Sequence, residues 1–293
     1  MKIDQNKIQV NENIKRLLTQ ITDFKKKLSS LARFMKKYSK IEPNSLESVQ
    51  KLSSTLAKIE GMASSLEECS LKASLMSSIE EETKKLEDLS TNLTSSFAIG
   101  LDKLLSEKGL KLKGRMPKLT CGFYTIDVDI NNSRCKLYYG PKEEFIITLK
   151  LDTEVISDFI ALHRKQLDTS FSNLDIFISQ LEKAYRTVTN RSEDQHGKKT
   201  PIIKVMTELS ILKQSRKFLT DPLRSNFQDY GRIQFSYDLY RVFQTPLKRL
   251  TLRLSPATRN QARNRAEYLW VPKDERGNGT IYSYIELVRL SNV

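Results

Sequence analysis

The stretch Ile14-Lys-Arg-Leu17-Leu-Thr-Gln-Ile21-Thr-Asp-Phe24-Lys-Lys-Lys-Leu28-Ser-Ser-Leu31 decides how the first part of this chain folds. Its apolar side chains recur at intervals of three and four residues, which places them along one stripe of an α-helix. The pattern extends from Ile3 to Tyr38 and is typical of a coiled coil, whose stripe packs against a second helix. We expect assembly through the seam Ile14, Leu17, Ile21, Phe24, Leu28, Leu31 and Met35.

A second amphipathic segment follows after a short break. Pro43 interrupts the first helix because proline lacks a backbone N–H, and Ser45 is a good N-cap for the next helix. An apolar stripe then runs from Leu46 to Leu104, and its phase shifts at residues 73–76 through either a heptad insertion or a break between two helices. The short turn predicts an antiparallel helical hairpin, and the pattern leaves open whether the helices pair within one chain or between chains.

Residues 109–118 form the clearest domain boundary, with two glycines, one proline and four basic residues. After this segment the apolar period changes from seven to two. Residues 123–130, 134–139 and 145–151 alternate between apolar and polar side chains and are separated by turn residues, which predicts an antiparallel meander.

The predicted fold class is α+β, in three parts. A coiled-coil helical hairpin covers residues 1–108, a basic linker covers 109–118, and a basic domain of mixed antiparallel sheet and helix covers 119–293. Within the last part, the patterns predict helices at 153–187 and 201–218 and strands at 233–239 and 250–254.

The C-terminal segment resembles the last part of a winged helix in its order of elements. Ser255-Pro256 predicts the start of a helix over 257–266, and a strand, the tip Gly277-Asn278-Gly279 and a strand over 281–290 follow. In a winged helix the helix enters a groove of the duplex. Arginine and asparagine side chains make paired hydrogen bonds to guanine and adenine.

These features predict a nucleic-acid-binding surface, and the alternative is an exposed cationic segment that closes a sheet. The candidate contact residues are basic or amide side chains of the C-terminal segment and of the linker: Arg249, Arg253, Arg259, Asn260, Arg263, Asn264, Arg265, Lys273, Arg276, Lys113 and Arg115. Contact with phosphates requires only positive charge and reach.

The charge balance favours the same class of partner. The chain has 49 basic and 35 acidic residues, a net charge of +14. Residues 1–110 hold 18 basic and 15 acidic residues, so most of the excess lies beyond the predicted hairpin. A strongly basic protein favours nucleic acid, an acidic protein or an anionic lipid surface as its partner.

The three cysteines and the lack of a signal peptide or of a long apolar run indicate a cytoplasmic protein without a membrane span. Clustered metal ligands, nucleotide-binding loops and hydrolase motifs are missing from the sequence, so we expect no cofactor and no metal site.

One arrangement favours an enzyme instead. Asp127 and Asp129 on one predicted strand, with Glu144 and Lys150 on the polar face of another, resemble the carboxylates that hold a divalent ion in nucleases. Thr148 stands where such sites usually have an acid, and the wet face of an amphipathic sheet accounts for the same residues.

The sequence therefore predicts a non-catalytic scaffold subunit of a multi-protein complex that binds nucleic acid, with DNA favoured over RNA. Its further partners are protein subunits or copies of the same chain. A purely structural protein–protein interaction subunit is the first alternative, and a divalent-metal nuclease or a degenerate relative is the second.

Overall fold

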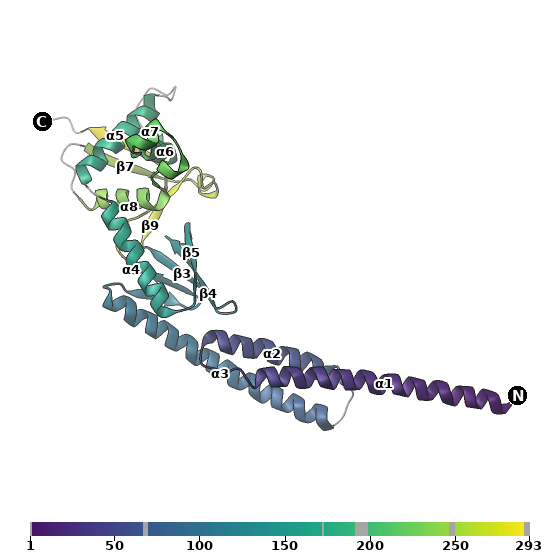
Figure 1. Ribbon diagram of the computed structural model, residues 1–293. Helices are drawn as coiled ribbons and strands as arrows, with labels where there is room; N and C mark the ends of the chain where they lie inside the picture. The colour runs from purple at the N-terminus through teal and green to yellow at the C-terminus, as the bar shows by residue number, and fades with distance from the viewer. Residues whose placement is uncertain (1, 67–69, 172, 191–198, 246–249, 290–293) are drawn as a thin grey trace. The chain divides into compact units, whose positions relative to one another are not determined.

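The computed structural model describes residues 2–66, 70–171, 173–190, 199–245 and 250–289 (Figure 1). It confirms an α+β fold in which helices come first and antiparallel sheets follow. The chain divides into two compact units: unit 1 comprises Met1–Ile99 with Ile130–Ser133, and unit 2 comprises Gly100–Asp129 with Arg134–Val293.

Unit 1 is built from α1 (Lys2–Tyr38), α2 (Leu46–Ser64) and the part of α3 (Ser70–Glu107) that ends at Ile99. The helix predicted from Ile3 to Tyr38 is confirmed, as is the N-cap at Ser45. The Ser45 hydroxyl accepts a hydrogen bond from the Ser48 N–H at 3.2 Å, and the Ser48 hydroxyl accepts one from the Ser45 N–H at 3.0 Å. The second stripe is divided between two helices, and α2 already ends at Ser64, before the predicted shift in phase.

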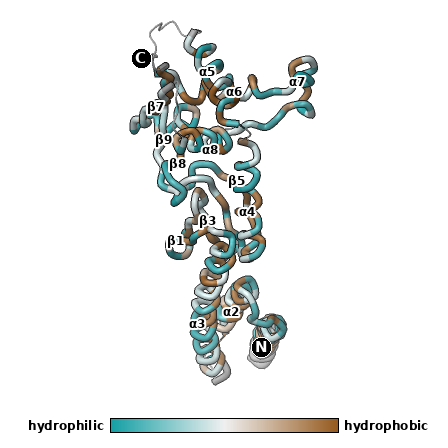
Figure 2. The backbone as a smooth tube through the Cα atoms, turned by 90° about the vertical axis from the view of Figure 1, so that its left-hand side faces the viewer, coloured by the Kyte–Doolittle hydropathy of each residue, from teal (hydrophilic) through white to brown (hydrophobic). Residues whose placement is uncertain are grey.

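The three helices of unit 1 share one apolar core. Leu31 of α1, Leu56 of α2 and Ile79 of α3 are all buried in it. α2 lies along the C-terminal part of α1, and the N-terminal part of α1 continues beyond it (Figure 1). Hydrophobic and hydrophilic residues alternate along α3 (Figure 2), as expected of a helix with one covered face.

Unit 2 begins with a five-stranded antiparallel sheet in the order β1-β2-β3-β4-β5. Its strands are β1 (Leu112–Arg115), β2 (Lys118–Cys121), β3 (Tyr124–Asp129), β4 (Arg134–Tyr139) and β5 (Glu144–Lys150). The predicted meander is confirmed in β3, β4 and β5, since each pairs antiparallel with the next. Residues 112–115 of the predicted linker form β1, which pairs with β2.

The rest of unit 2 comprises further helices and a second antiparallel sheet, in which β9 pairs with β6, β7 and β8. The helices are α4 (Thr153–Ser170), α5 (Leu174–Asn190), α6 (Ile202–Leu212), α7 (Arg216–Thr220) and α8 (Arg232–Phe243), and the strands are β6 (Thr200–Pro201), β7 (Leu250–Pro256), β8 (Leu269–Pro272) and β9 (Gly279–Arg289). Two short 3₁₀ turns are η1 (Arg224–Asn226) and η2 (Gln261–Arg263).

Four predictions of secondary structure in unit 2 differ from the structure. The helix predicted over 153–187 is divided into α4 and α5, and the helix predicted over 201–218 is divided into α6 and α7. The segment read as a strand over 233–239 is the helix α8, in which every residue from Phe235 to Tyr240 is buried. A helix that is covered on all sides has no polar face, so its apolar residues carry no helical period. The helix predicted over 257–266 is only the short turn η2, so a winged-helix order is not confirmed in the described part of the chain.

Aromatic packing connects the two sheets of unit 2. The indole of Trp270 on β8 contacts the ring of Tyr139 on β4, with ring centroids 5.1 Å apart. A Cβ atom on Gly140 would lie 2.8 Å from the Trp270 ring, and one on Gly279 would lie 2.5 Å from it. Glycine at both positions therefore allows the indole to lie against the backbone, and the two sheets share a core.

Candidate assembly stripe and basic loop

The predicted seam of α1 divides into a covered half and an exposed half. Leu31 is 5% exposed and Leu28 packs against the same core. At the C-terminal end of this covered half, the Tyr38 hydroxyl donates a hydrogen bond to Glu82 Oε2 on α3 at 3.0 Å. Met35, predicted for the same seam, is 45% exposed.

The exposed half forms a continuous apolar surface that we call the α1 stripe. Ile14, Leu17 and Ile21 are 49%, 57% and 62% exposed, and Leu18 and Phe24 extend the surface on either side. These residues sit three or four positions apart, so their side chains lie along one side of the helix. Large apolar side chains that gather in this way make the α1 stripe a candidate interaction site.

Basic residues surround the α1 stripe. Between Glu12 and Lys27, α1 has five basic and two acidic residues. Only Lys26 forms an ion pair among them in the described structure, with Asp23 at 3.9 Å. The flanks of the stripe are therefore positively charged.

The predicted recognition helix is an exposed loop that we call the basic loop, residues 257–268. Polar side chains bond to its own backbone here: Gln261 Oε1 accepts from the Thr258 N–H at 2.9 Å, and Asn264 Oδ1 accepts from the Ala266 N–H at 3.0 Å. Such local bonds compete with helical ones, which explains why the helix does not form.

Four of the predicted contact residues remain available to a partner on this loop. Arg259, Asn260, Arg263 and Asn264 are exposed. Asn264 Nδ2 donates to Glu267 Oε1 at 2.6 Å, whereas neither arginine forms an ion pair within the part of the chain that the structure describes. The two arginines thus carry uncompensated positive charge.

Arg265, predicted for the same surface, is also exposed, but its guanidinium has an acidic partner. Its guanidinium donates to Glu144 Oε2, and the guanidinium of Arg232 on α8 donates to Glu144 Oε1. Arg232 also donates to the carbonyl oxygens of Arg265 at 2.9 Å and Tyr268 at 2.8 Å. This cluster, the Glu144 clamp, attaches β5 to α8 and to the basic loop.

The other predicted contact residues are distributed over three elements. Arg253 is exposed on β7 and lies opposite Glu286 of β9. Lys273 and Arg276 are exposed on the tip between β8 and β9, and Lys113 and Arg115 are exposed on β1. Arg249 lies outside the described residues.

The β8–β9 tip is fixed against its neighbours in unit 2. Glu275 forms an ion pair with Arg164 of α4 at 3.4 Å. A Cβ atom on Gly277 would lie 2.0 Å from the carbonyl oxygen of Gly122, so the two backbones are in contact. Lys273 and Arg276 therefore lie exposed on a tip whose position is fixed by these two contacts.

The four residues of the nuclease alternative do not share one face of the sheet. Glu144 is 3% exposed and pairs with Tyr139, whereas Asp127 belongs to the row of Lys136 and Thr148. An irregularity between Leu137 and Tyr138 explains the error, because one extra residue in β5 reverses the alternation of side chains.

The remaining acids of that alternative also have basic neighbours. Asp127 forms an ion pair with Lys142 at 2.7 Å. Asp129 lies in the row of Arg134 and Lys150. Among the described residues, no group of three histidine, cysteine or acidic side chains is placed to hold a metal ion.

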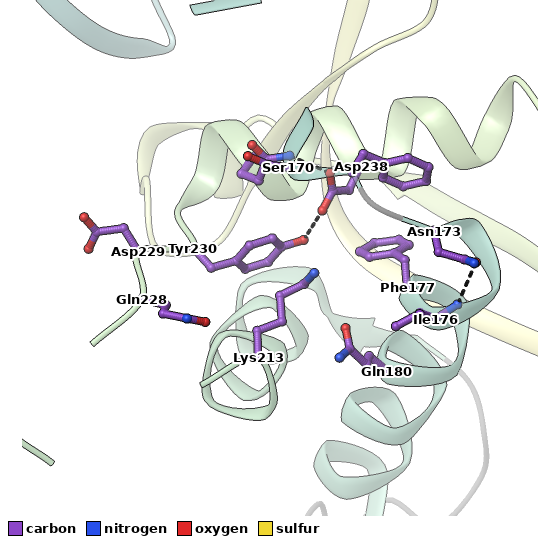
Figure 3. Close-up of a pocket in the computed structure, with 12 residues that line it drawn as sticks. Ser170, Asn173, Ile176, Phe177, Gln180, Lys213, Gln228, Asp229, Tyr230 and Asp238 are labelled. Carbon is purple, nitrogen blue, oxygen red and sulfur yellow. Dashed lines mark hydrogen bonds between the residues drawn. The ribbon is translucent and has the colours of Figure 1, made fainter. Parts of the chain in front are cut away.

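A polar pocket in unit 2 was missed by the sequence analysis (Figure 3). It contains Lys213, Tyr230 and Asp238, and Asp238 is 1% exposed. One signal was available, because Asp238 stands directly between Tyr237 and Leu239 in a segment rich in aromatic and apolar residues. A charged residue in such a segment is buried only with partners.

Comparison with protein-family models, with curated proteins and with solved structures finds no match to this chain. No helix within the described ranges is long and apolar enough to cross a membrane.

Proposed function

We propose that this protein is a non-catalytic subunit of a multi-protein complex that contacts nucleic acid, with DNA favoured over RNA. The α1 stripe joins it to a further helix, and unit 2 supplies the electrostatic contact. The observation that carries the proposal is the basic loop, on which Arg259 and Arg263 are exposed without an acidic partner in the described structure.

Charge supports the nucleic-acid part of the proposal. The residues after position 110 include 31 basic and 20 acidic side chains, a net charge of +11. Lys113, Arg115, Lys273 and Arg276 add exposed positive charge to that of the basic loop. Contacts of this kind bind phosphates without regard to sequence, so the expected mode is non-specific and salt-dependent.

Exposed apolar area supports the assembly part. The apolar side chains of the α1 stripe are unfavourably exposed to water. A helix with a matching apolar row would cover them as in a coiled coil. The basic flanks of the stripe favour an acidic helix over a second copy of α1, because like charges oppose self-pairing. A homo-oligomer is tested by the mass of the purified protein.

The alternative of a purely structural subunit is favoured by the same stripe and flanks. In that case the basic loop meets an acidic protein and no nucleic acid binds. Two buried free thiols, Cys121 and Cys135, support a reducing compartment such as the cytoplasm in either case.

The decisive experiment is the binding of random-sequence duplex DNA measured by fluorescence anisotropy over a series of salt concentrations. We expect log K to fall linearly with log salt. The variant Arg259→Glu with Arg263→Glu should bind more weakly and reduce the slope by about 2, since each lost phosphate contact removes about 0.9.

A matched control carries the same change of charge elsewhere. Lys58 and Lys84 are exposed on α2 and α3, and their double replacement by glutamate should leave binding by unit 2 close to wild type. If the wild-type protein binds no duplex at low salt, the proposal fails and the structural alternative stands. Equal binding by the two double variants would remove the basic loop from the contact surface.

A further inference from the structure

The polar pocket of unit 2 has a volume of about 310 Å³, at the small end of ligand sites in proteins. It lies between the start of α5, the residue after α6 and the segment leading into α8 (Figure 3). A site of this size suits a small metabolite and excludes a dinucleotide.

The walls of the pocket are fixed by hydrogen bonds. The buried Gln214 amide accepts from the Gln228 N–H at 2.8 Å and donates to the Gln228 carbonyl at 2.9 Å, so it attaches the end of α6 to the opposite wall. Asn173 Oδ1 accepts from the Asp175 N–H at 2.8 Å and thereby holds the start of α5. The pocket is therefore preformed.

Lys213 brings a positive charge into this space. Its Nζ atom lies 4.6 Å from the ring centroid of Tyr230 and 5.6 Å from that of Phe177. Aromatic faces attract an ammonium group but accept no conventional hydrogen bond. No described residue provides an acceptor within hydrogen-bonding distance of Nζ, and Lys213 lines the pocket, so a ligand there can accept from it.

Asp238, the nearest acid to this lysine, already has partners. The Tyr230 hydroxyl donates to Asp238 Oδ2 at 2.6 Å, and Gln234 Nε2 donates to Oδ1 at 2.7 Å (Figure 3). Both carboxylate oxygens are thus occupied by neutral donors, and Asp238 makes no ion pair with Lys213. Asp229 also lines the pocket, but it is exposed at the rim.

A second group in the pocket also lacks a partner. The Oε1 atom of Gln180 on α5 is buried and accepts no hydrogen bond. A buried acceptor without a donor is costly, by about 1–3 kcal/mol. The pocket therefore has a cation that needs an acceptor and, in its wall, a buried acceptor that a ligand hydroxyl reaches when the Gln180 side chain turns toward the cavity.

We infer that this pocket binds a small polar molecule that carries an anionic oxygen group next to a hydroxyl. The anionic group lies on Lys213 Nζ, the hydroxyl donates to Gln180 Oε1, and the carbon skeleton lies against the Phe177 and Tyr230 rings. A phosphate and a carboxylate both provide the anionic oxygen, and experiment distinguishes between them.

The test uses the full-length protein and three probes: inorganic phosphate, acetate and lactate, each titrated by calorimetry against sodium chloride of equal ionic strength. We expect phosphate or lactate to bind with a Kd in the millimolar range or below. Lactate should bind more tightly than acetate, because only lactate adds a hydroxyl beside its carboxylate. Preferential binding of phosphate or of lactate identifies the anionic group of the natural ligand.

Lys213→Met keeps an unbranched side chain between the two rings but removes the charge, and it should weaken binding at least tenfold. Lys217→Met is the matched control, because Lys217 is exposed on α7 and does not line the pocket. Gln180→Met should abolish the preference for lactate over acetate while leaving acetate binding unchanged, and it decides the question even if Lys213→Met does not fold. Failure of phosphate and lactate to bind above the chloride background would overturn the inference, as would equal affinities in the Lys213 and Lys217 variants.

Discussion

Unit 1 exposes a row of large apolar side chains along one helix, whereas unit 2 exposes apolar side chains on several elements, such as Phe145 and Leu219, and buries two acidic ones. The exposed row and the buried acids both depart from the usual distribution of residues, but in opposite directions. The buried acids of unit 2 find partners within the chain: Glu144 has two arginines, and Asp238 has Tyr230 and Gln234. The α1 stripe finds none among the described residues, so it is the row of side chains that a partner helix would cover.

The largest effect is expected where the seam of α1 is covered. Leu31→Asp places a charge among the apolar side chains of all three helices in unit 1, and burying a charge without a partner is strongly unfavourable. We expect a loss of about 4 kcal/mol in the free energy of unfolding, measured by urea denaturation. A loss below 1 kcal/mol would mean that α1 does not pack as described.

The next largest effect is a pH dependence of stability caused by Asp238, the buried acid in the pocket. Burial raises the pKa of Asp238 to about 6, against the opposing effect of hydrogen bonds from Tyr230 and Gln234 and of the Lys213 charge. The folded protein therefore holds this proton more tightly than the unfolded chain, whose aspartate pKa is about 3.9. The contribution to stability is greatest below pH 4 and is lost as the pH rises to 6.

Between pH 4 and 6, the contribution of Asp238 to the free energy of unfolding should fall by about 3 kcal/mol, at about 1.4 kcal/mol per pKa unit. Other carboxylates titrate in the same range, so the measured quantity is the difference between the wild type and Asp238→Asn. Stability of the wild type relative to the variant should fall from pH 4 to 6 and stay constant above it. A difference that does not change with pH contradicts a raised Asp238 pKa.

Removal of the charge at Glu144 should have a smaller effect. Glu144→Gln leaves the largely buried Arg232 without its carboxylate, but Arg232 keeps its bonds to two carbonyl oxygens. We therefore expect a loss of about 2 kcal/mol in thermal or chemical unfolding. Asp127→Asn is the control, because its ion pair with Lys142 is partly exposed and should contribute less than 1 kcal/mol. Equal losses in both variants would show that the Glu144 clamp has no special role.

The sequence predicts correctly those elements in which apolar residues recur at a constant helical or strand interval. The heptads of α1 and the alternation in β3 and β4 each follow a single face. α8 was misread because its central residues, from Phe235 to Tyr240, are all buried. Glu144 was assigned to the wrong face because no pattern marks the irregularity next to Leu137.

In the candidate sites, too, a local sequence pattern predicts only part of the structure. The exposed arginines of the basic loop follow from composition, but the pairing of Arg265 with Glu144, 121 positions earlier in the chain, does not. The pocket joins Phe177, Lys213 and Asp238, which belong to separate helices and turns. Contacts of this kind arise from tertiary packing, which a local pattern does not encode.

The smallest effect on stability, and the sharpest test of the comparison, is expected on the α1 stripe. Ile21→Asp changes the same seam as Leu31→Asp, three turns earlier, at a side chain that is 62% exposed. The free energy of unfolding of the isolated protein should change by less than about 0.5 kcal/mol, since an exposed site loses little packing. Association should nevertheless be lost, measured as a fall in mass by sedimentation or as loss of a co-purifying subunit. If association survives this change, the α1 stripe is not the assembly surface, and its exposed apolar residues need another explanation.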